Sequence, residues 1–311
     1  MTAKLRIGTR GSRLALVQTE MVVRALRLKV PGLEAEIVKI QTSGDWKPGQ
    51  GEEPLPEAGG GKAYFAKEIE EALLAEKIDC GVHSLKDMAS ALPEGLAIDH
   101  VLPRADARDA FLANDYKTLD DLPEEAVVGT TSPRRKAFLL ARRPDLEIVN
   151  LRGNVPTRIE KLRDRQVDAT LLALAGLQRL DLEDEVASVL EIEDMLPCAG
   201  QGIIGIELRA GDRELYPLFD RIHCRKTGLC AAAERAAVAV LGGSCHTPIG
   251  AHAVMKSKDM ALEVILASPD GRQMFHEKAR QPVSTVEQAR DFGAQLGKKI
   301  KDRAPKDLLA G

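Results

Sequence analysis

Short apolar runs typical of buried strands alternate along this chain with longer stretches in which apolar residues recur every three or four positions, as in helices. The first strand is predicted at 5–8, and Ser12 is a suitable N-cap for the helix that follows it. The apolar face of that helix is predicted to comprise Leu14, Val17, Met21 and Leu28. The order of strand, Gly-Thr and capped helix recurs at 127–135. This repetition predicts two similar α/β units, each with an anion site at the end of a strand.

Further elements fit the same α/β pattern. Strands are predicted at 36–42, 78–82, 147–151, 169–173 and 203–207, and helices near 65–73 and 157–165. The strand at 203–207 follows a flexible turn at 198–202, and we expect it to return the chain to the first unit. The predicted domains are therefore 1–103 with 203–221, then 104–202, and finally 222–311.

Residues 222–311 show a different order of predicted helices and strands. An alanine-rich helix is predicted at 231–241 and strands at 251–255 and 261–267, and a Ser-Pro-Asp-Gly turn at 268–271 then leads into another strand. Ser284 and Glu287 have the spacing of a capping box, which predicts a last helix ending near Lys301. This part of the chain is predicted to be a small α+β domain.

Composition narrows the functional classes. A chain of 311 residues with 44% hydrophobic content can bury the cores of about two or three domains. A net charge of −3, with one Trp, three Tyr and six Phe, argues against a nucleic-acid-binding protein, which needs a basic face and stacking surfaces. No apolar run reaches the length of a membrane span or of a signal sequence. The five cysteines are scattered, so we expect a reducing cytoplasm and free, buried thiols at Cys80, Cys198, Cys224 and Cys230.

A cluster of arginines lies at 129–158 and comprises Arg134, Arg135, Arg142, Arg143, Arg152 and Arg158. Ser132 and Pro133 suit the N-cap and the first position of a helix. The next two residues, Arg134 and Arg135, then lie in its first turn. Cations are unfavourable at this positive end of the helix dipole unless an anion binds there. We therefore interpret the stretch as a cradle for a carboxylate or phosphate, and the alternative is a solvated basic face.

Ionisable groups also gather directly after the strand at 78–82, the position at which open α/β sheets bind ligands. Asp87 is either a carboxylate that works as acid, base or cation stabiliser, or one half of a surface ion pair with Lys86. Trp46–Gly61 is predicted to be a surface loop. Lys62, which follows the loop, is either an anion contact or a solvated lysine.

One cysteine differs from the others. Cys245 lies between Gly-Gly-Ser and His-Thr-Pro, in a loop whose glycines allow a ligand to approach and whose thiol is chemically available. Neither paired metal-ligand spacings nor a distant His and Asn/Asp pair accompanies it, which argues against a metal site and against a cysteine protease. Cys245 is therefore the candidate for a thiol with a chemical role.

Motifs spread over nearly the whole chain are similar, in order, to those of the porphobilinogen deaminase (hydroxymethylbilane synthase) family. They are 6–10 (RIGTR), 42–45 (TSGD), 60–62 (GGK) with Phe65, 82–87 (VHSLKD), 129–135 (GTTSPRR), 151–154 (LRGN) with Thr157 and Arg158, 175–177 (AGL) with Arg179, 200–202 (GQG), 233–235 (AER) and the Cys245 loop. No single motif suffices, but so many in sequence are specific. The chain departs from the family pattern at Ser244, at Ala63-Tyr64, at Met88-Ala89 and in the length of the 46–59 loop.

The resemblance implies two α/β domains similar to type II periplasmic binding proteins and a smaller C-terminal α+β domain. It implies that Cys245 anchors a dipyrromethane cofactor through a thioether. The implied reaction joins four porphobilinogen molecules head to tail with loss of ammonia and releases hydroxymethylbilane by hydrolysis, in a cytoplasmic monomer. A rival interpretation is a two-lobed carboxylate-binding module without catalysis, which would need neither Asp87 nor Cys245.

The resemblance also implies roles for individual residues. Asp87 matches the family's acid, which protonates the leaving amine and stabilises the pyrrolic cation. Each pyrrole carries an acetate and a propionate, and planar guanidinium groups suit carboxylates. The residues expected to bind these carboxylates are Arg10, Ser12, Lys86, Ser132, Arg134, Arg135, Arg152, Arg158 and Arg179. Weaker site candidates are Gln18, Lys62, Phe65, Ser84 and Gln201.

Overall fold

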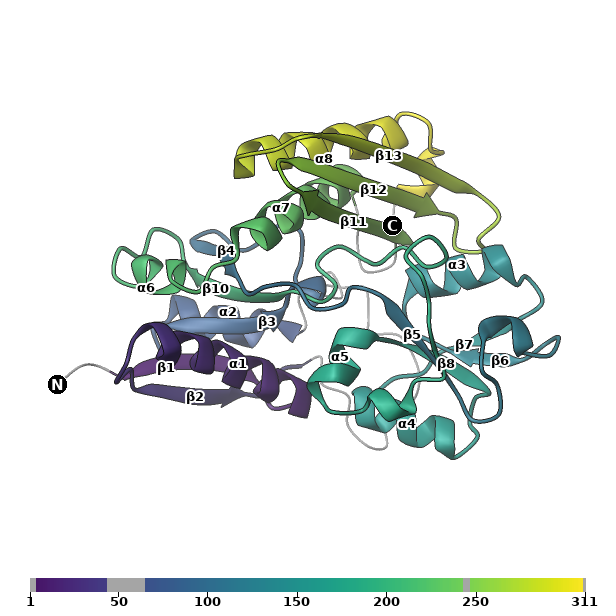
Figure 1. Ribbon diagram of the computed structural model, residues 1–311, viewed down its shortest axis with the longest axis horizontal. Coiled ribbons are helices and arrows are strands. Elements are labelled where there is room, and N and C mark those ends of the chain that lie inside the picture. The colour runs from purple at the N-terminus through teal and green to yellow at the C-terminus, as the bar shows by residue number, and fades with distance from the viewer. Residues whose placement is uncertain (1–3, 44–64, 243–246, 310–311) are drawn as a thin grey trace.

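The computed structural model describes residues 4–43, 65–242 and 247–309. Three sheets organise these residues, two of five strands and one of three. Figure 1 shows the three-stranded sheet above the two larger sheets, which lie side by side. The predicted Trp46–Gly61 loop, Lys62 and Cys245 fall outside the described residues.

The first sheet has the strand order β2-β1-β3-β10-β4. Its strands are β1 (Leu5–Arg10), β2 (Ala35–Ile40), β3 (Cys80–Ser84), β4 (Leu96–Val101) and β10 (Ile204–Arg209). β1 runs parallel to β2 and β3, whereas β10 is antiparallel to β3 and β4. Helix α1 (Arg13–Lys29) packs on one face of the sheet and α2 (Lys67–Leu74) on the other, because their apolar side chains belong to different cores. A 3-10 turn, η2 (Leu85–Asp87), follows β3.

The second sheet repeats this arrangement in the order β7-β6-β8-β5-β9. Its strands are β5 (Asp109–Ala113), β6 (Val127–Gly129), β7 (Glu147–Val149), β8 (Ala169–Ala173) and β9 (Ser188–Val189). Its helices are α3 (Pro133–Arg142), α4 (Val155–Arg163) and α5 (Leu174–Arg179), with 3-10 turns η3 (Leu119–Asp121) and η4 (Glu183–Glu185). β6 is parallel to β7 and β8, and β5 is antiparallel to β8 and β9, so strand directions match those of the first sheet. The predicted pair of similar α/β units is confirmed.

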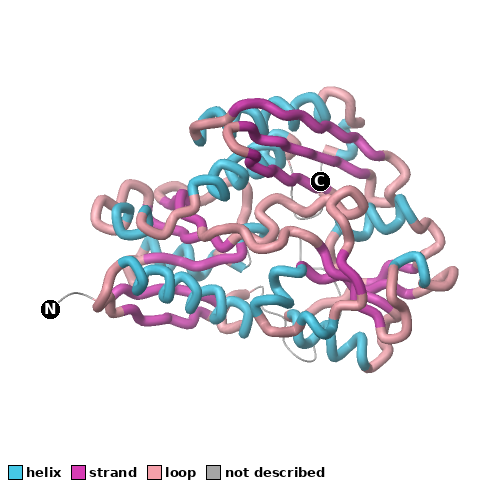
Figure 2. The backbone as a smooth tube through the Cα atoms, in the orientation of Figure 1, coloured by secondary structure: helices cyan, strands magenta, loops and turns pink. Residues whose placement is uncertain are grey.

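The chain crosses between these two units twice, because β10 comes late in the sequence and yet pairs with β3 and β4. The remaining elements are α6 (Tyr216–Asp220), α7 (Arg225–Val240), β11 (Ile249–Lys256), β12 (Asp259–Ala267), β13 (Met274–Pro282), α8 (Val286–Lys301) and η5 (Lys306–Leu308). Figure 2 shows α7 and α8 on one side of the three-stranded sheet, and they bury one core with it. The fold class is therefore confirmed as two α/β units and a smaller C-terminal α+β unit.

The predicted apolar face of α1 is wrong. Met21 and Leu28 are 40% and 75% exposed. The buried positions of the helix are Ala15, Gln18, Thr19, Val22, Val23 and Leu26. Polar residues lie on the buried face because they have partners there: Gln18 bonds Ser84, and Thr19 donates to the carbonyl of Ala15. The true buried face also carries Ala15, Val22, Val23 and Leu26, and it was missed because Gln18 and Thr19 interrupt their pattern.

Two helix starts in the C-terminal unit also differ from prediction. The N-cap of α8 is Thr285, whose side chain accepts from the N–H of Gln288, so the cap lies one residue after the predicted Ser284. Gln288 Oε1 accepts from the N–H of Ser284, the residue before the cap, whereas a capping box requires the N–H of the cap residue itself. Helix α7 begins at Arg225, well before the alanine-rich stretch that predicted it.

Candidate functional site

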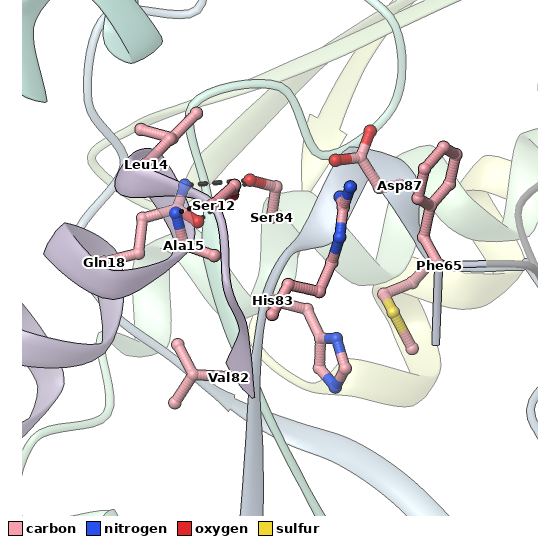
Figure 3. A pocket seen from close by; sticks show the side chains of 11 residues that line it. Ser12, Leu14, Ala15, Gln18, Phe65, Val82, His83, Ser84 and Asp87 are labelled. Carbon is pink, nitrogen blue, oxygen red and sulfur yellow. Dashed lines mark hydrogen bonds between the residues drawn. The ribbon is translucent and has the colours of Figure 1, made fainter. Parts of the chain in front are cut away.

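A pocket lies where β1 and β3 end, beside the start of α1. Predicted site residues in its lining are Arg10, Ser12, Gln18, Phe65, Ser84 and Asp87. Figure 3 shows Ser12 and Gln18 at the start of α1 on one side and Asp87 and Phe65 on the other, with Ser84 between them. The carboxyl ends of parallel strands are the usual ligand position in open α/β sheets, so the placement agrees with the sequence-based expectation.

Local interactions fix the geometry of this pocket. Ser12 caps α1 by accepting from the N–H of Ala15, as predicted. Gln18 Nε2 donates to Ser84 Oγ at 2.8 Å, which ties α1 to the end of β3. The Arg10 guanidinium lies 4.3 Å from the centre of the Phe65 ring, a cation–π distance. Asp87 forms no salt bridge within the described chain, which removes the interpretation of a surface ion pair with Lys86.

Lys86 feels both Asp87 and a second group of charges. Burial lowers the pKa of its ammonium, whereas the charge of Asp87 and, after it, that of Asp109 raise it. Asp109 is fully buried and accepts hydrogen bonds of 2.6 Å from both Arg134 and Arg135. Burial alone would raise the pKa of the Asp109 carboxyl, but the two guanidinium charges outweigh it and hold that pKa well below its usual range.

The anion in the predicted arginine cradle is therefore Asp109 of the same chain. Ser132 caps α3 by accepting from the N–H of Arg135, and Pro133 opens the helix, as predicted. Sequence reasoning missed Asp109, although an acid at the start of the apolar strand β5 is a signal for a buried partner. Gln201 lies behind this cluster, fully buried, and donates to Asp109 and to the carbonyl of Ala107.

The other arginines of the stretch divide into two groups. Arg142 is exposed and pairs with Asp120 and Asp194, so the solvated-face interpretation holds for it. It is wrong for Arg143, which is half-buried and bonds Asp145 and the carbonyls of Leu119, Leu122 and Pro123. Arg152 and Arg158 are half-buried where α4 begins. There, the Nε of Arg158 donates to the carbonyl of Gly153 at 2.9 Å.

Arg179 lies at the end of α5, the helix of the second unit that approaches the pocket. A side chain at Gly176 of α5 would come within 3.6 Å of Leu14, which lines the pocket. Arg179 donates to the carbonyl of Gly202 at 2.7 Å, and burial lowers its pKa to about 10. Its Nε is buried and has no hydrogen-bond partner among the described residues, and the same holds for Nε of Arg134.

Glu234 is a further buried acid to which the sequence alone assigned no role. It is fully buried and forms an ion pair with Arg104, and it accepts from the N–H groups of Gly200 at 2.8 Å and Ala253 at 2.7 Å. Arg104 lies on the first crossing between the α/β units, Gly200 on the second, and Ala253 in the C-terminal unit. One carboxylate therefore joins all three parts of the fold.

The expectation of buried thiols is correct for Cys80 and Cys230 and wrong for Cys198 and Cys224, which are half-buried. Cys198 is exposed in part because it lies on the second crossing, where its thiol contacts Gln201. Among the described residues, we find no group of three or more His, Cys, Asp or Glu side chains arranged to hold a metal ion. No described helix has both the length and the hydropathy of a membrane span.

Two family models cover most of the chain. One, described as porphobilinogen deaminase, dipyromethane cofactor binding domain, matches residues 5–217. The other, described as porphobilinogen deaminase, C-terminal domain, matches residues 228–302. This chain belongs to the porphobilinogen deaminase family. The predicted family, its dipyrromethane cofactor and the interpretation as a transferase are thereby confirmed, in preference to a non-catalytic binding module.

Porphobilinogen deaminases of several bacteria are similar to this chain over nearly their full length. Those of Paracoccus denitrificans and Alkaliphilus metalliredigens are 44% and 39% identical over 308 and 305 residues, covering 98% of this chain and 96% and 94% of theirs. Among solved structures, a nutrient binding protein from Burkholderia cenocepacia bound to methionine is 13% identical with a TM-score of 0.44, covering 72% of this chain and 93% of that one. The fold class rests on the sheet order itself and not on that likeness.

Proposed function

We propose that this porphobilinogen deaminase family member joins four porphobilinogen molecules head to tail, with loss of ammonia, on a dipyrromethane primer and releases hydroxymethylbilane by hydrolysis. The observation that carries the proposal is the pocket at the ends of β1 and β3, in which Asp87 meets Arg10 and the Gln18–Ser84 pair. In a chain of this family, that arrangement supplies one carboxyl group for proton transfer beside groups that bind anions.

Asp87 is the residue to which we assign proton transfer. It is the last residue of the turn η2, and its side chain is half-buried. A carboxylic acid at this position donates a proton to the departing amino group of porphobilinogen, and its conjugate base then stabilises the positive charge that develops on the pyrrole. The same carboxylate accepts the proton that the new bond releases.

The chain's donors fit a cofactor rich in carboxylates. When bound, the dipyrromethane supplies the pyrrole carbon to which new rings are added. Arg179 and Arg134 each keep a buried N–H donor without a partner in the described chain, and an anionic group satisfies such donors at little cost. We propose that the cofactor is attached through a thioether to Cys245. Its acetates and propionates, and those of the substrate, are assigned to Arg10, Ser12, Lys86, Ser132, Arg152, Arg158 and Arg179, with Arg134 and Arg135 contributing beside Asp109.

We further propose three domains, 1–103 with 203–221, 104–202 and 222–311. The pairing of β10 with β3 and β4 supports the discontinuous first domain. A cytoplasmic monomer without nucleic-acid or membrane partners completes the proposal, supported by the free thiols and the net charge of −3.

Intact-mass spectrometry tests attachment of the cofactor. We expect purified protein to carry the added mass of a dipyrromethane and the Cys245→Ser variant to lack it. Active wild-type protein with the mass of the bare polypeptide, and so without an adduct, would contradict attachment at Cys245.

Turnover of porphobilinogen tests the site. Asp87→Asn is expected to keep the adduct and to lose activity by about 100-fold or more, the usual contribution of a positioned acid or base. Arg152→Leu or Arg158→Leu is expected to stall chain growth, visible as accumulated intermediate masses. Arg165→Leu is the matched control, because Arg165 pairs with Asp115 on the surface. Normal turnover by Asp87→Asn would remove Asp87 from its role.

A further inference from the structure

A buried polar cluster lies behind the pocket, on the face of the first sheet that α2 covers. His83 of β3 contacts Oε2 of Glu207 on β10 through its Nε2 at 3.0 Å. Glu70 of α2 joins them, and the three residues are 6%, 0% and 9% exposed, in the order His83, Glu207 and Glu70. Figure 3 shows the His83 ring directed away from Asp87. The proposed reaction uses none of these three side chains.

Glycines on the neighbouring strand positions make room for the cluster. In the β3–β10 register, Glu207 lies opposite Gly81 and His83 lies opposite Gly205. A Cβ atom on Gly81 would lie 2.8 Å from Nε2 of His83, closer than such atoms pack. Each large polar side chain thus faces a residue without one. Apolar side chains could fill this space without the free-energy cost of removing charged groups from water. The buried acids and imidazole therefore reduce the stability of the fold relative to an apolar core.

The cluster holds more acid than the imidazole can neutralise. Glu207 Oε1 is buried without a hydrogen-bond partner among the described residues. Burial raises the pKa of Glu70 to about 7, the charge of Glu207 acts in the same direction, and His83 opposes both. The other charged groups that face the cluster are Glu71 from α2 and Arg235 from α7. The charge of Glu207 therefore disfavours the ionised form of Glu70, and the charge of His83 favours it.

The cluster is connected directly to the segment that carries Asp87. His83 is followed by Ser84, whose hydroxyl bonds Gln18, and then by the turn η2. The N–H of Leu85 donates to the carbonyl of Ile203, next to the start of β10. Beyond the turn, Arg235 donates to the carbonyls of Ala89 and Ser90. Strand β10 and helix α7 therefore hold the segment from both sides of Asp87.

We propose that Glu207 is a positioning residue for this pocket: it holds the His83 ring, within reach of the charge of Glu70, and thereby fixes the turn that presents Asp87. Glu207 acts through His83 and touches no substrate. The effect on turnover rests on the proposed role of Asp87, whereas the contact of His83 with these acids does not. A displacement of about 1 Å at a reacting group costs on the order of 100-fold in rate, so a small shift of the turn is measurable.

Three substitutions test the proposal. Glu207→Gln keeps the size and the hydrogen bond to His83 but removes the charge, and Glu70→Gln imitates permanently protonated Glu70. Glu71→Gln is the matched control on the same helix, because Glu71 is exposed. For each folded variant, kcat, KM and cofactor mass are measured across pH. The ring signals of His83, assigned by their loss in His83→Asn, are followed by nuclear magnetic resonance.

We expect Glu207→Gln to lower kcat by about 10-fold to 100-fold, with KM within about twofold of wild type and the cofactor mass retained. In the wild type, the His83 signals should shift as Glu70 titrates near neutral pH. That shift should vanish in Glu70→Gln and persist in Glu71→Gln. A residue that only stabilised the fold would lower the unfolding temperature and leave both kcat of the folded protein and the His83 titration unchanged.

Two results overturn the proposal. One is a folded, cofactor-loaded Glu207→Gln variant with kcat within about twofold of wild type. The other is a change in the His83 ring signals near neutral pH that is still present in Glu70→Gln. This second measurement does not require Glu207→Gln to fold. Normal turnover in Asp87→Asn, with the response of the His83 signals to Glu70 intact, would instead refute the role of Asp87 and leave the link between His83 and Glu70 standing.

Discussion

Replacing Asp109 by Asn would remove the counter-ion of two buried arginines at once. Arg134 and Arg135 are 3% and 5% exposed, and each donates to an oxygen of Asp109 at 2.6 Å. Asn keeps the size of the side chain but carries no charge, and its amide group presents a donor to one of the two guanidinium groups. Both cations then lie in the interior without a neutralising group, and neither can lose its proton.

The expected cost follows from burial. Removing one partner of a buried ion pair costs about 3–5 kcal/mol, because the remaining charge stays buried and unpaired. Two arginines share Asp109, so we expect a loss at the upper end, about 4–5 kcal/mol of unfolding free energy. In protein that carries the cofactor, bound carboxylates should offset part of the loss, so the effect should be larger in the Cys245→Ser background.

Urea unfolding followed by circular dichroism measures this loss. Asp115→Asn is the matched control, because Asp115 pairs with Arg165 at 2.7 Å with side chains that are 54% and 71% exposed. An exposed pair contributes about 0–1 kcal/mol. If Asp109→Asn were no more destabilising than Asp115→Asn, the reasoning that Asp109 neutralises the arginine cluster would be refuted.

Three other predictions concern stability. Glu234→Gln should lower the unfolding free energy by about 3 kcal/mol, because Arg104 loses its counter-ion; calorimetry that shows an unchanged unfolding temperature would contradict this. Ser132→Ala should cost about 1 kcal/mol through loss of the α3 cap, and urea unfolding that shows no difference from wild type would be the contrary result. The pKa of Glu70 is raised from 4.5 to about 7 in the folded protein, so its protonated side chain stabilises the fold fully below about pH 4.5, and this contribution is lost as pH rises through about 7. Relative to Glu70→Gln, the unfolding free energy of the wild type should therefore fall by up to about 3 kcal/mol between about pH 4.5 and 8. Unfolding free energies of the two proteins that change in parallel with pH would contradict this prediction.

Periodicity predicted the elements that depend on local sequence. The strand expected at 169–173 is β8 (Ala169–Ala173). The caps at Ser12 and Ser132 formed as expected, because the N–H groups that they bind lie three residues further on. The buried face of α1 could not be predicted in this way. Gln18 is buried there because Ser84, far along the chain, accepts its hydrogen bond. A polar residue with a distant partner is indistinguishable from a surface residue in a single sequence.

The candidate site shows the same division. The motif residues Arg10, Ser84 and Asp87 were found from the sequence and lie in one pocket. Asp109 was not found, because its meaning depends on Arg134 and Arg135 reaching it from another element. The partner of His83 was missed for a similar reason, since Glu207 belongs to β10, the strand that returns to the first unit after the chain has passed through the second.

The two crossings between the α/β units have a mechanical consequence. They touch where the N–H of Ala105 donates to the carbonyl of Gly202. A side chain at Gly202 would be strained by its φ of +82° and would collide with the carbonyl oxygen of Ala105. Glu234 holds Arg104 on one crossing and Gly200 on the other. Glu234 therefore couples both crossings to the C-terminal unit, and a tilt of one α/β unit against the other would strain its hydrogen bonds. If the cofactor is attached at Cys245 as proposed, the growing product is tethered to the same unit whose carboxylate resists that tilt.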